Sequence, residues 1–156
     1  MPNPDDLSRS QAAQSHSQPP PDEGPWKDWF LSLLVSMANS TGLSLPLTVT
    51  VDGFMVTGDL CSGMDFFNDF GESFSAGAKN EGDKAAMKQT FVGLAADVYN
   101  RSDRDDNEDY IGYLHLKDAR FFSSPHSPMP GNRGVFWRCR IGSVSGFFLG
   151  KLEANQ

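Results

Sequence analysis

Few residues in this sequence are of the types that perform catalysis, and their spacing completes no catalytic motif. A serine hydrolase places its nucleophile at the centre of Gly-x-Ser-x-Gly, but residues 142–146 put Val144 at that position. His115 lies in a β-like segment and could approach Cys139 on a neighbouring strand, although a structural histidine and a buried thiol are the interpretation we favour. The other two histidines lie in polar or proline-rich segments. We therefore expect no catalytic residue and no cofactor.

An acidic segment, residues 102–109, is the candidate for a metal site. Its side chains match positions 1, 3, 5 and 7 of a calcium loop at Asp103, Asp105, Asn107 and Asp109. A calcium loop also needs glycine at position 6 and a bidentate glutamate at position 12, where this sequence has Glu108 and Leu114. We therefore expect a solvated acidic loop or a contact for a basic partner, and no bound metal.

Charge is distributed unevenly along the 156 residues. The net charge is −7, but residues 1–109 carry 7 basic and 18 acidic residues, whereas residues 110–156 carry 6 basic and 2 acidic ones. The basic residues of the last third are Lys117, Arg120, Arg133, Arg138, Arg140 and Lys151. Basic strands with phenylalanines could stack bases, but the signature of an RNA-recognition sheet is missing. We favour a charged sheet face that pairs with acidic segments of the same chain or of another copy.

The first half of the chain predicts a tail, a helix and a hairpin. Residues 1–24 are rich in proline, serine and glutamine, so we expect a disordered tail. From Pro25 an apolar stripe predicts a helix that docks on the core and ends near Gly42. The stripe consists of Trp26, Trp29, Phe30, Leu33, Leu34 and Met37, and Leu31 or Val35 would widen the buried face. Two apolar stretches, 45–51 and 54–60, flank Asp52-Gly53, the strongest short-range signal for a hairpin.

The second half predicts helices followed by strands. A stripe of phenylalanines after the N-cap residue Ser62 predicts a helix that packs against the sheet; they are Phe66, Phe67, Phe70 and Phe74. Residues 78–100 predict a third helix. Residues 110–122 predict either one long strand or a strand with a bulge near Lys117-Asp118. Residues 134–144 with 147–152 predict a second hairpin across Ser145-Gly146.

These elements predict a single α+β domain, residues 25–153, with about five strands in a largely antiparallel sheet and two or three helices covering one face. Phe147 and Phe148 must point to opposite faces of their strand, so one is free for a contact if the core takes the other. The candidate interaction residues are Phe136, Arg138, Arg140, Phe147, Phe148 and Lys151.

Three blocks of the last third carry a resemblance to a known family. They are residues 113–119 (Tyr-Leu-His-Leu-Lys-Asp-Ala), 134–138 (Gly-Val-Phe-Trp-Arg) and 146–151 (Gly-Phe-Phe-Leu-Gly-Lys). Together they resemble the GvpU-type gas vesicle accessory proteins over roughly residues 28–152. The tail and the acidic loop lie outside the matched pattern.

The resemblance implies a cytosolic, non-catalytic protein of gas-vesicle-forming prokaryotes that takes part in vesicle assembly or clustering. The implied partners are the vesicle shell, other gas vesicle proteins and a second copy of the chain. Two cysteines are too few for a disulfide framework, which fits a reducing compartment. No apolar run is long enough to span a membrane. The alternative function is a small nucleic-acid-binding β domain that uses the basic strands.

Overall fold

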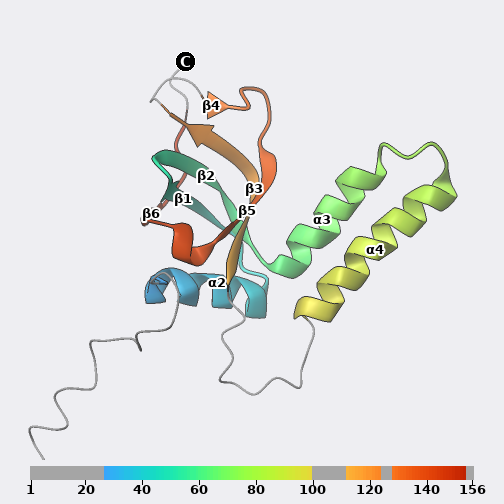
Figure 1. Cartoon of the computed structure of the whole chain (residues 1–156), viewed down its shortest axis with the longest axis horizontal. Coiled ribbons are helices and arrows are strands. Elements are labelled where there is room, and N and C mark those ends of the chain that lie inside the picture. The colour runs from blue at the N-terminus through green and yellow to red at the C-terminus, as the bar shows by residue number, and fades with distance from the viewer. Residues whose placement is uncertain (1–26, 100–111, 124–127, 154–156) are drawn as a thin grey trace, which may run out of the picture.

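The computed structural model describes residues 27–99, 112–123 and 128–153. The predicted tail, with Pro25 and Trp26 after it, and the acidic loop lie outside these ranges. The helices are α2 (Trp29–Thr41), α3 (Gly63–Ser75) and α4 (Glu81–Tyr99). The strands are β1 (Leu45–Val51), β2 (Phe54–Cys61), β3 (Tyr113–Phe122), β4 (Pro128–Met129), β5 (Val135–Arg140) and β6 (Gly146–Leu149), with a 3₁₀ turn η1 (Ile141–Ser143) before β6. Figure 1 shows the sheet above α2, with α3 and α4 projecting to one side.

Within the described residues, six strands form one antiparallel sheet in the order β4-β3-β2-β1-β6, with β5 also paired to β3. The first hairpin forms as predicted, because Asp52 and Gly53 adopt the positive φ angles, 50° and 82°, that its two-residue turn requires. Of the two alternatives for residues 110–122, the strand with a bulge is the one observed. Register shifts between Leu116 and Ala119, where Asp118 has a φ of 49°. The single α+β domain of the sequence analysis is therefore confirmed.

The second predicted hairpin is wrong. β5 pairs with β3, and β6 pairs with β1 at the opposite edge of the sheet. Only residues 141–145 join them, and η1 shortens their reach to about 16 Å, because a 3₁₀ turn rises about 2 Å per residue. In a flat sheet the two residues to be joined, Arg140 and Gly146, would be separated by more than the four strand spacings between them, which alone amount to about 19 Å. Arg140 is opposite Tyr113 at the start of β3, whereas Gly146 is opposite Thr50, which pairs through Met55 with Phe122 at the end of β3. The sheet therefore curls until its edges approach each other, and the buried side chain of Ile141 packs at this junction.

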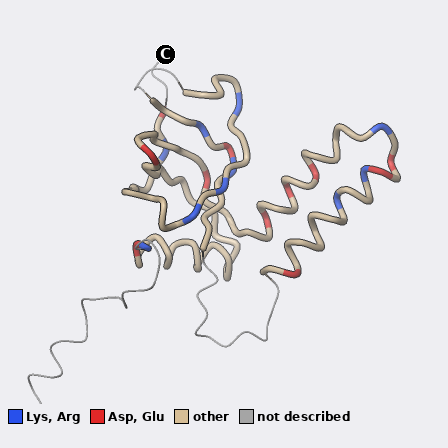
Figure 2. The backbone as a smooth tube through the Cα atoms, viewed as in Figure 1, with Lys and Arg blue, Asp and Glu red and all other residues tan. Residues whose placement is uncertain are grey.

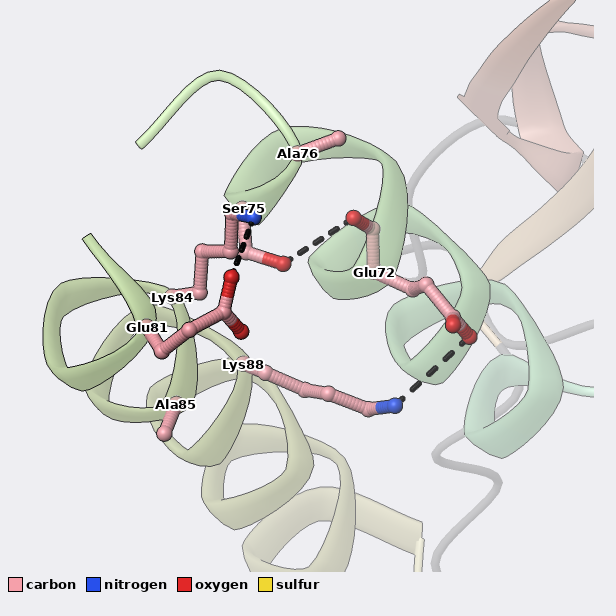
Figure 3. A pocket seen from close by; sticks show the side chains of 7 residues that line it. All are labelled: Glu72, Ser75, Ala76, Glu81, Lys84, Ala85 and Lys88. Atoms are coloured by element: carbon pink, nitrogen blue, oxygen red, sulfur yellow. Dashed lines mark hydrogen bonds and ion pairs between the residues drawn. The ribbon is translucent and has the colours of Figure 1, made fainter. Parts of the chain in front are cut away.

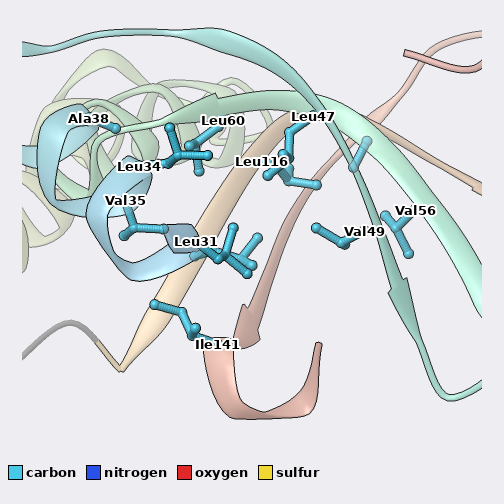
Figure 4. Packing of buried hydrophobic residues seen from close by; sticks show 12 residues of the cluster. Leu31, Leu34, Val35, Ala38, Leu47, Val49, Val56, Leu60, Leu116 and Ile141 are labelled. Carbon is cyan, nitrogen blue, oxygen red and sulfur yellow. The ribbon is translucent and has the colours of Figure 1, made fainter. Parts of the chain in front are cut away.

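The main core lies between α2 and the concave face of the sheet (Figure 4). Asp28 caps α2 by accepting the Leu31 N–H at 2.8 Å, and Gly42 ends the helix with a φ of 69°. The buried side chains of α2 are Leu31, Leu34, Val35 and Ala38. The predicted docking stripe is therefore wrong apart from Leu34, whereas Leu31 and Val35, the residues expected to widen the buried face, are both buried. Trp29, Phe30, Leu33 and Met37 face outward.

Helices α3 and α4 form a two-helix arm, residues 63–99, which packs mainly on itself. Phe66, at its base, is buried against His115 of β3, as the phenylalanine stripe predicted. Phe70 also packs edge-on against Phe136 of β5, and it meets Phe91 of α4 in the same way. Phe74 instead packs edge-on against Phe91 alone among these two partners and stays exposed. The arm base and α2 touch opposite faces of the sheet, because His115 and its core-facing neighbour Leu116 point in opposite directions. The expectation that the helices cover one face is therefore wrong.

Candidate interaction surfaces

The group of residues that most resembles a catalytic centre surrounds His115 on the face opposite α2. His115 is buried, and its Nε2 atom lies 3.3 Å from the hydroxyl oxygen of Tyr99 at the end of α4. The Phe66 ring lies 4.8 Å away, centroid to centroid. The Nδ1 atom of His115 has no hydrogen-bond partner in the described part of the chain. Burial, together with the nearby Arg138 guanidinium, lowers the pKa of His115 to about 4, so the ring is neutral near pH 7.

The two cysteines lack the low thiol pKa of a nucleophilic cysteine. Cys139 is in register with Leu114, so its side chain does not meet His115. Cys61 is the thiol beside this histidine; it is in register with His115 and its Sγ atom donates to the His115 carbonyl oxygen at 3.6 Å. Burial raises the pKa of both thiols to about 12, whereas reactive cysteines have a lowered pKa. The arrangement is that of a packed structural cluster.

The basic residues of β5 form a small aromatic-cationic surface beside this cluster. The Arg138 guanidinium lies 3.6 Å from the centroid of the Tyr113 ring, close enough for a cation–π contact. A hydrogen bond from Arg140 lowers the pKa of the Tyr113 hydroxyl. Phe136 packs edge-on against Phe66 and so connects this face of β5 with α3 of the arm. Trp137 and Cys139 alternate with these residues along β5 and pack toward the core.

Other basic residues are paired with acids of the same chain. The Lys117 ammonium lies 2.8 Å from the carboxylate of Asp69 on α3, and this bond raises the pKa of Lys117. The Lys151 ammonium lies 2.6 Å from Asp59 and 3.4 Å from Asp118. These three carboxylates are close to the sheet face on which the sequence analysis expected charge pairing. The pairing within one copy is therefore present.

Phe147 and Phe148 take opposite faces of β6, as alternation requires. Phe147 is in register with Val49 and packs against the core, with its ring centroid 5.8 Å from that of Phe30. Phe148 is in register with Thr48 and is 47% exposed. Gly150 then turns the chain with a φ of 120°, so that Lys151 crosses to Asp59.

The six predicted interaction residues lie at two separate places on the sheet. Phe136, Arg138 and Arg140 lie on β5, and Phe147 and Phe148 lie on β6 at the other end of the strand order. Phe148 shares the outer face of the sheet with the three β5 residues, because each of these four alternates with residues packed on the core, whereas Phe147 is on the core face. Lys151 follows β6 and is ion-paired with Asp59.

The described residues include an exposed apolar surface that the sequence analysis assigned to the core. We call it the outer stripe of α2: Trp29, Phe30, Leu33 and Met37, exposed by 76%, 41%, 46% and 41%. The signal was present, because this helix carries large apolar residues over more of its surface than one core contact can bury. Figure 2 shows no charge along α2 after Lys27 and Asp28 at its beginning.

A shallow hollow of about 400 Å³ lies between α3 and α4 near their connection (Figure 3). Its charged side chains are already matched: the Lys84 ammonium lies 2.7 Å from Glu81, and that of Lys88 lies 3.6 Å from Glu72. Among the described residues, no cluster of histidine, cysteine or acidic side chains suits a metal ion. None of the described helices combines the length and apolar character needed to cross a membrane.

Fold and surfaces define a small α+β domain that offers apolar and charged faces for contact with other molecules. The family model described as gas vesicle protein GvpU-like matches residues 28–152, and the chain belongs to this family. No curated protein and no solved structure matches the chain.

Proposed function

We propose that this chain is a non-enzymatic gas vesicle accessory protein of the cytoplasm. In this proposal it associates with the vesicle shell or other gas vesicle proteins and with itself, and so helps to organise vesicle assembly or clustering. Membership of the GvpU-like family supports the link to gas vesicles. The contact role is supported by the exposed surfaces of the domain.

The observation that carries the contact role is that exposed apolar side chains lie on three separate elements. Besides the outer stripe of α2, they include Phe148 and Leu149 on β6, and Phe74 on α3. A domain with contact points on several sides can hold two particles at once, and weak contacts add up when many copies act on one surface. Apolar surface that one copy leaves uncovered is also typical of interaction sites.

The nucleic-acid alternative receives less support from the structure. Lys117 and Lys151, two of the basic residues on which it depends, are ion-paired with carboxylates of the same chain. Binding a phosphate backbone relies on unpaired basic side chains that displace counterions. Arg138 and Arg140 of β5 are the basic residues placed for such a contact, and they form a small patch.

The adjacent phenylalanines of β6 provide a matched test of the contact role. Phe147→Ser should destabilise the fold by about 2–4 kcal/mol, because it removes a ring packed on the core. Phe148→Ser should leave the melting temperature nearly unchanged and reduce the amount of protein that floats with purified gas vesicles or self-associates. Loss of stability in both variants, with no specific loss of association, would contradict an interface role for Phe148.

A further inference from the structure

The outer stripe of α2 has the geometry of a helix–helix contact. Trp29, Leu33 and Met37 follow one another at intervals of four residues and form a ridge of large side chains. A row of small residues, Ser32, Ser36 and Ser40, runs beside it at the same interval. Rows at this spacing pack ridge into groove when two helices cross at about −50°.

Two of the three serine hydroxyls of this face, those of Ser32 and Ser40, can be covered at little cost. The Ser32 hydroxyl donates to the Asp28 carbonyl oxygen at 2.8 Å, and those of Ser40 and Thr41 donate to the Met37 carbonyl oxygen at 3.3 and 2.7 Å. Burying a hydroxyl is expensive when it loses its hydrogen bond. Here these bonds lie within the helix and persist when a partner excludes water.

We infer that the outer stripe of α2 is the contact between two copies of this chain, related by a two-fold axis near Leu33 and Ser36. The axis lays the large ridge of one copy along the serine row of the other, because both rows are centred on that point. It places Trp29 at the Met37 end of the second copy, where a thioether against an aromatic ring is favourable. The two helices run antiparallel, so their dipoles also attract.

Charge and composition favour a second copy over other occupants. α2 carries no charged residue from Trp29 to Thr41, so two copies of this face meet without repulsion. A membrane-surface helix would carry lysine or arginine beside its apolar face. The chain's own residues 1–24 have only Met1, Leu7, Ala12 and Ala13 as apolar side chains, too few to cover the stripe.

The size of the surface sets the strength of the contact. From their exposed fractions, the four side chains offer on the order of 350 Å² per copy. A stable specific interface buries about 800 Å² per partner. The dimer should therefore be weak and dissociate on dilution, as suits one of several contacts in a larger assembly.

This inference deepens the self-association part of the proposed function, and it is tested on the purified full chain without vesicles. Sedimentation velocity over a concentration series should show a reversible monomer–dimer equilibrium that persists in 0.5 M salt, since screening within a few Å does not weaken an uncharged contact. Leu33→Lys should raise the dissociation constant at least ~100-fold, because two ammonium groups would meet at the axis. Leu94→Lys, at a residue on the arm of similar exposure, 48%, should leave the equilibrium unchanged.

A cross-link tests the symmetry. Ser36→Cys should form a disulfide-linked dimer under mild oxidation, whereas Leu94→Cys should not, because only position 36 lies near the axis. A monomer at every concentration, equal effects of the two lysine variants, or equal cross-linking of the two cysteine variants would overturn the inference. If dimerisation holds and vesicle association fails, the dimer stands and the proposed vesicle role falls; the converse result removes the dimer alone.

Discussion

Two leucines of α2, two positions apart, should respond very differently to the same substitution. Leu31 is fully buried between the helix and the sheet, whereas Leu33 is 46% exposed on the outer stripe. Leu→Ala removes the same atoms at both positions, so the comparison isolates the environment. The pair therefore tests directly which face of α2 docks on the core.

Burial sets the expected magnitudes. Leu31 packs in the cluster with Val35, Val49 and Ile141 (Figure 4), and truncation there leaves a cavity. Leu31→Ala should cost about 3–4 kcal/mol and lower the melting temperature by about 10–15 °C for a domain of this size. Leu33→Ala should stay within about 0.5 kcal/mol in dilute solution.

The assay is urea unfolding followed by circular dichroism, at protein concentrations low enough to keep the chain monomeric. At higher concentration the wild type should gain stability by mass action and Leu33→Ala should lose that gain. Equal destabilisation of the two variants in dilute protein, or a larger effect at Leu33, would refute the assignment of the buried face.

Three further predictions concern stability and reactivity. His115 has its ordinary pKa of 6.5 in the unfolded chain and a pKa of about 4 in the folded chain. The free energy of unfolding should therefore fall by up to ~3 kcal/mol as the pH is lowered between these values, and His115→Leu should flatten that part of the pH profile. Gly63→Ala, at the start of α3, should destabilise the fold in thermal melts, because the added Cβ atom would collide with the ring of Tyr99 on α4. Gly93→Ala, on α4 itself, places its Cβ atom in open space and should stabilise the fold by about 0.5–1 kcal/mol. Cys61 and Cys139 should resist alkylation near neutral pH until the protein unfolds, and rapid labelling of the native protein would contradict their raised pKa.

The sequence predicted the elements whose signals are local. The Asp52-Gly53 turn needs two positive φ angles, and Ser62 caps α3 by accepting the Asp65 N–H at 2.9 Å. Both depend on residues close in sequence, so propensity and tertiary structure agree. The α+β class followed from these elements and did not depend on how distant strands pair.

What the sequence did not predict depends on long-range pairing. Residues 141–145 look like a turn, but Ser145 N donates to the Thr50 carbonyl oxygen at 2.9 Å and leads the chain to the other edge of the sheet. Only the curled sheet makes that route short. Likewise, α2 has two apolar faces, and its composition alone does not say which one the core takes.

Five of the six candidate interaction residues lie on β5 or β6, the two strands whose pairing was wrongly predicted. Phe148 was chosen from strand alternation and is exposed as that reasoning requires, while Phe136 packs against Phe66. The outer stripe of α2 was assigned to the core. Because the Leu31 face of α2 packs on the sheet, the outer stripe remains exposed.

Flotation of purified gas vesicles mixed with this protein tests whether the protein binds and clusters vesicles. Wild-type protein should rise with the vesicles and promote their clustering under the light microscope. The Phe148→Ser variant should do both less well at unchanged melting temperature. Wild-type protein that stays in the lower fraction and leaves the vesicles dispersed, at every protein-to-vesicle ratio, would contradict the account.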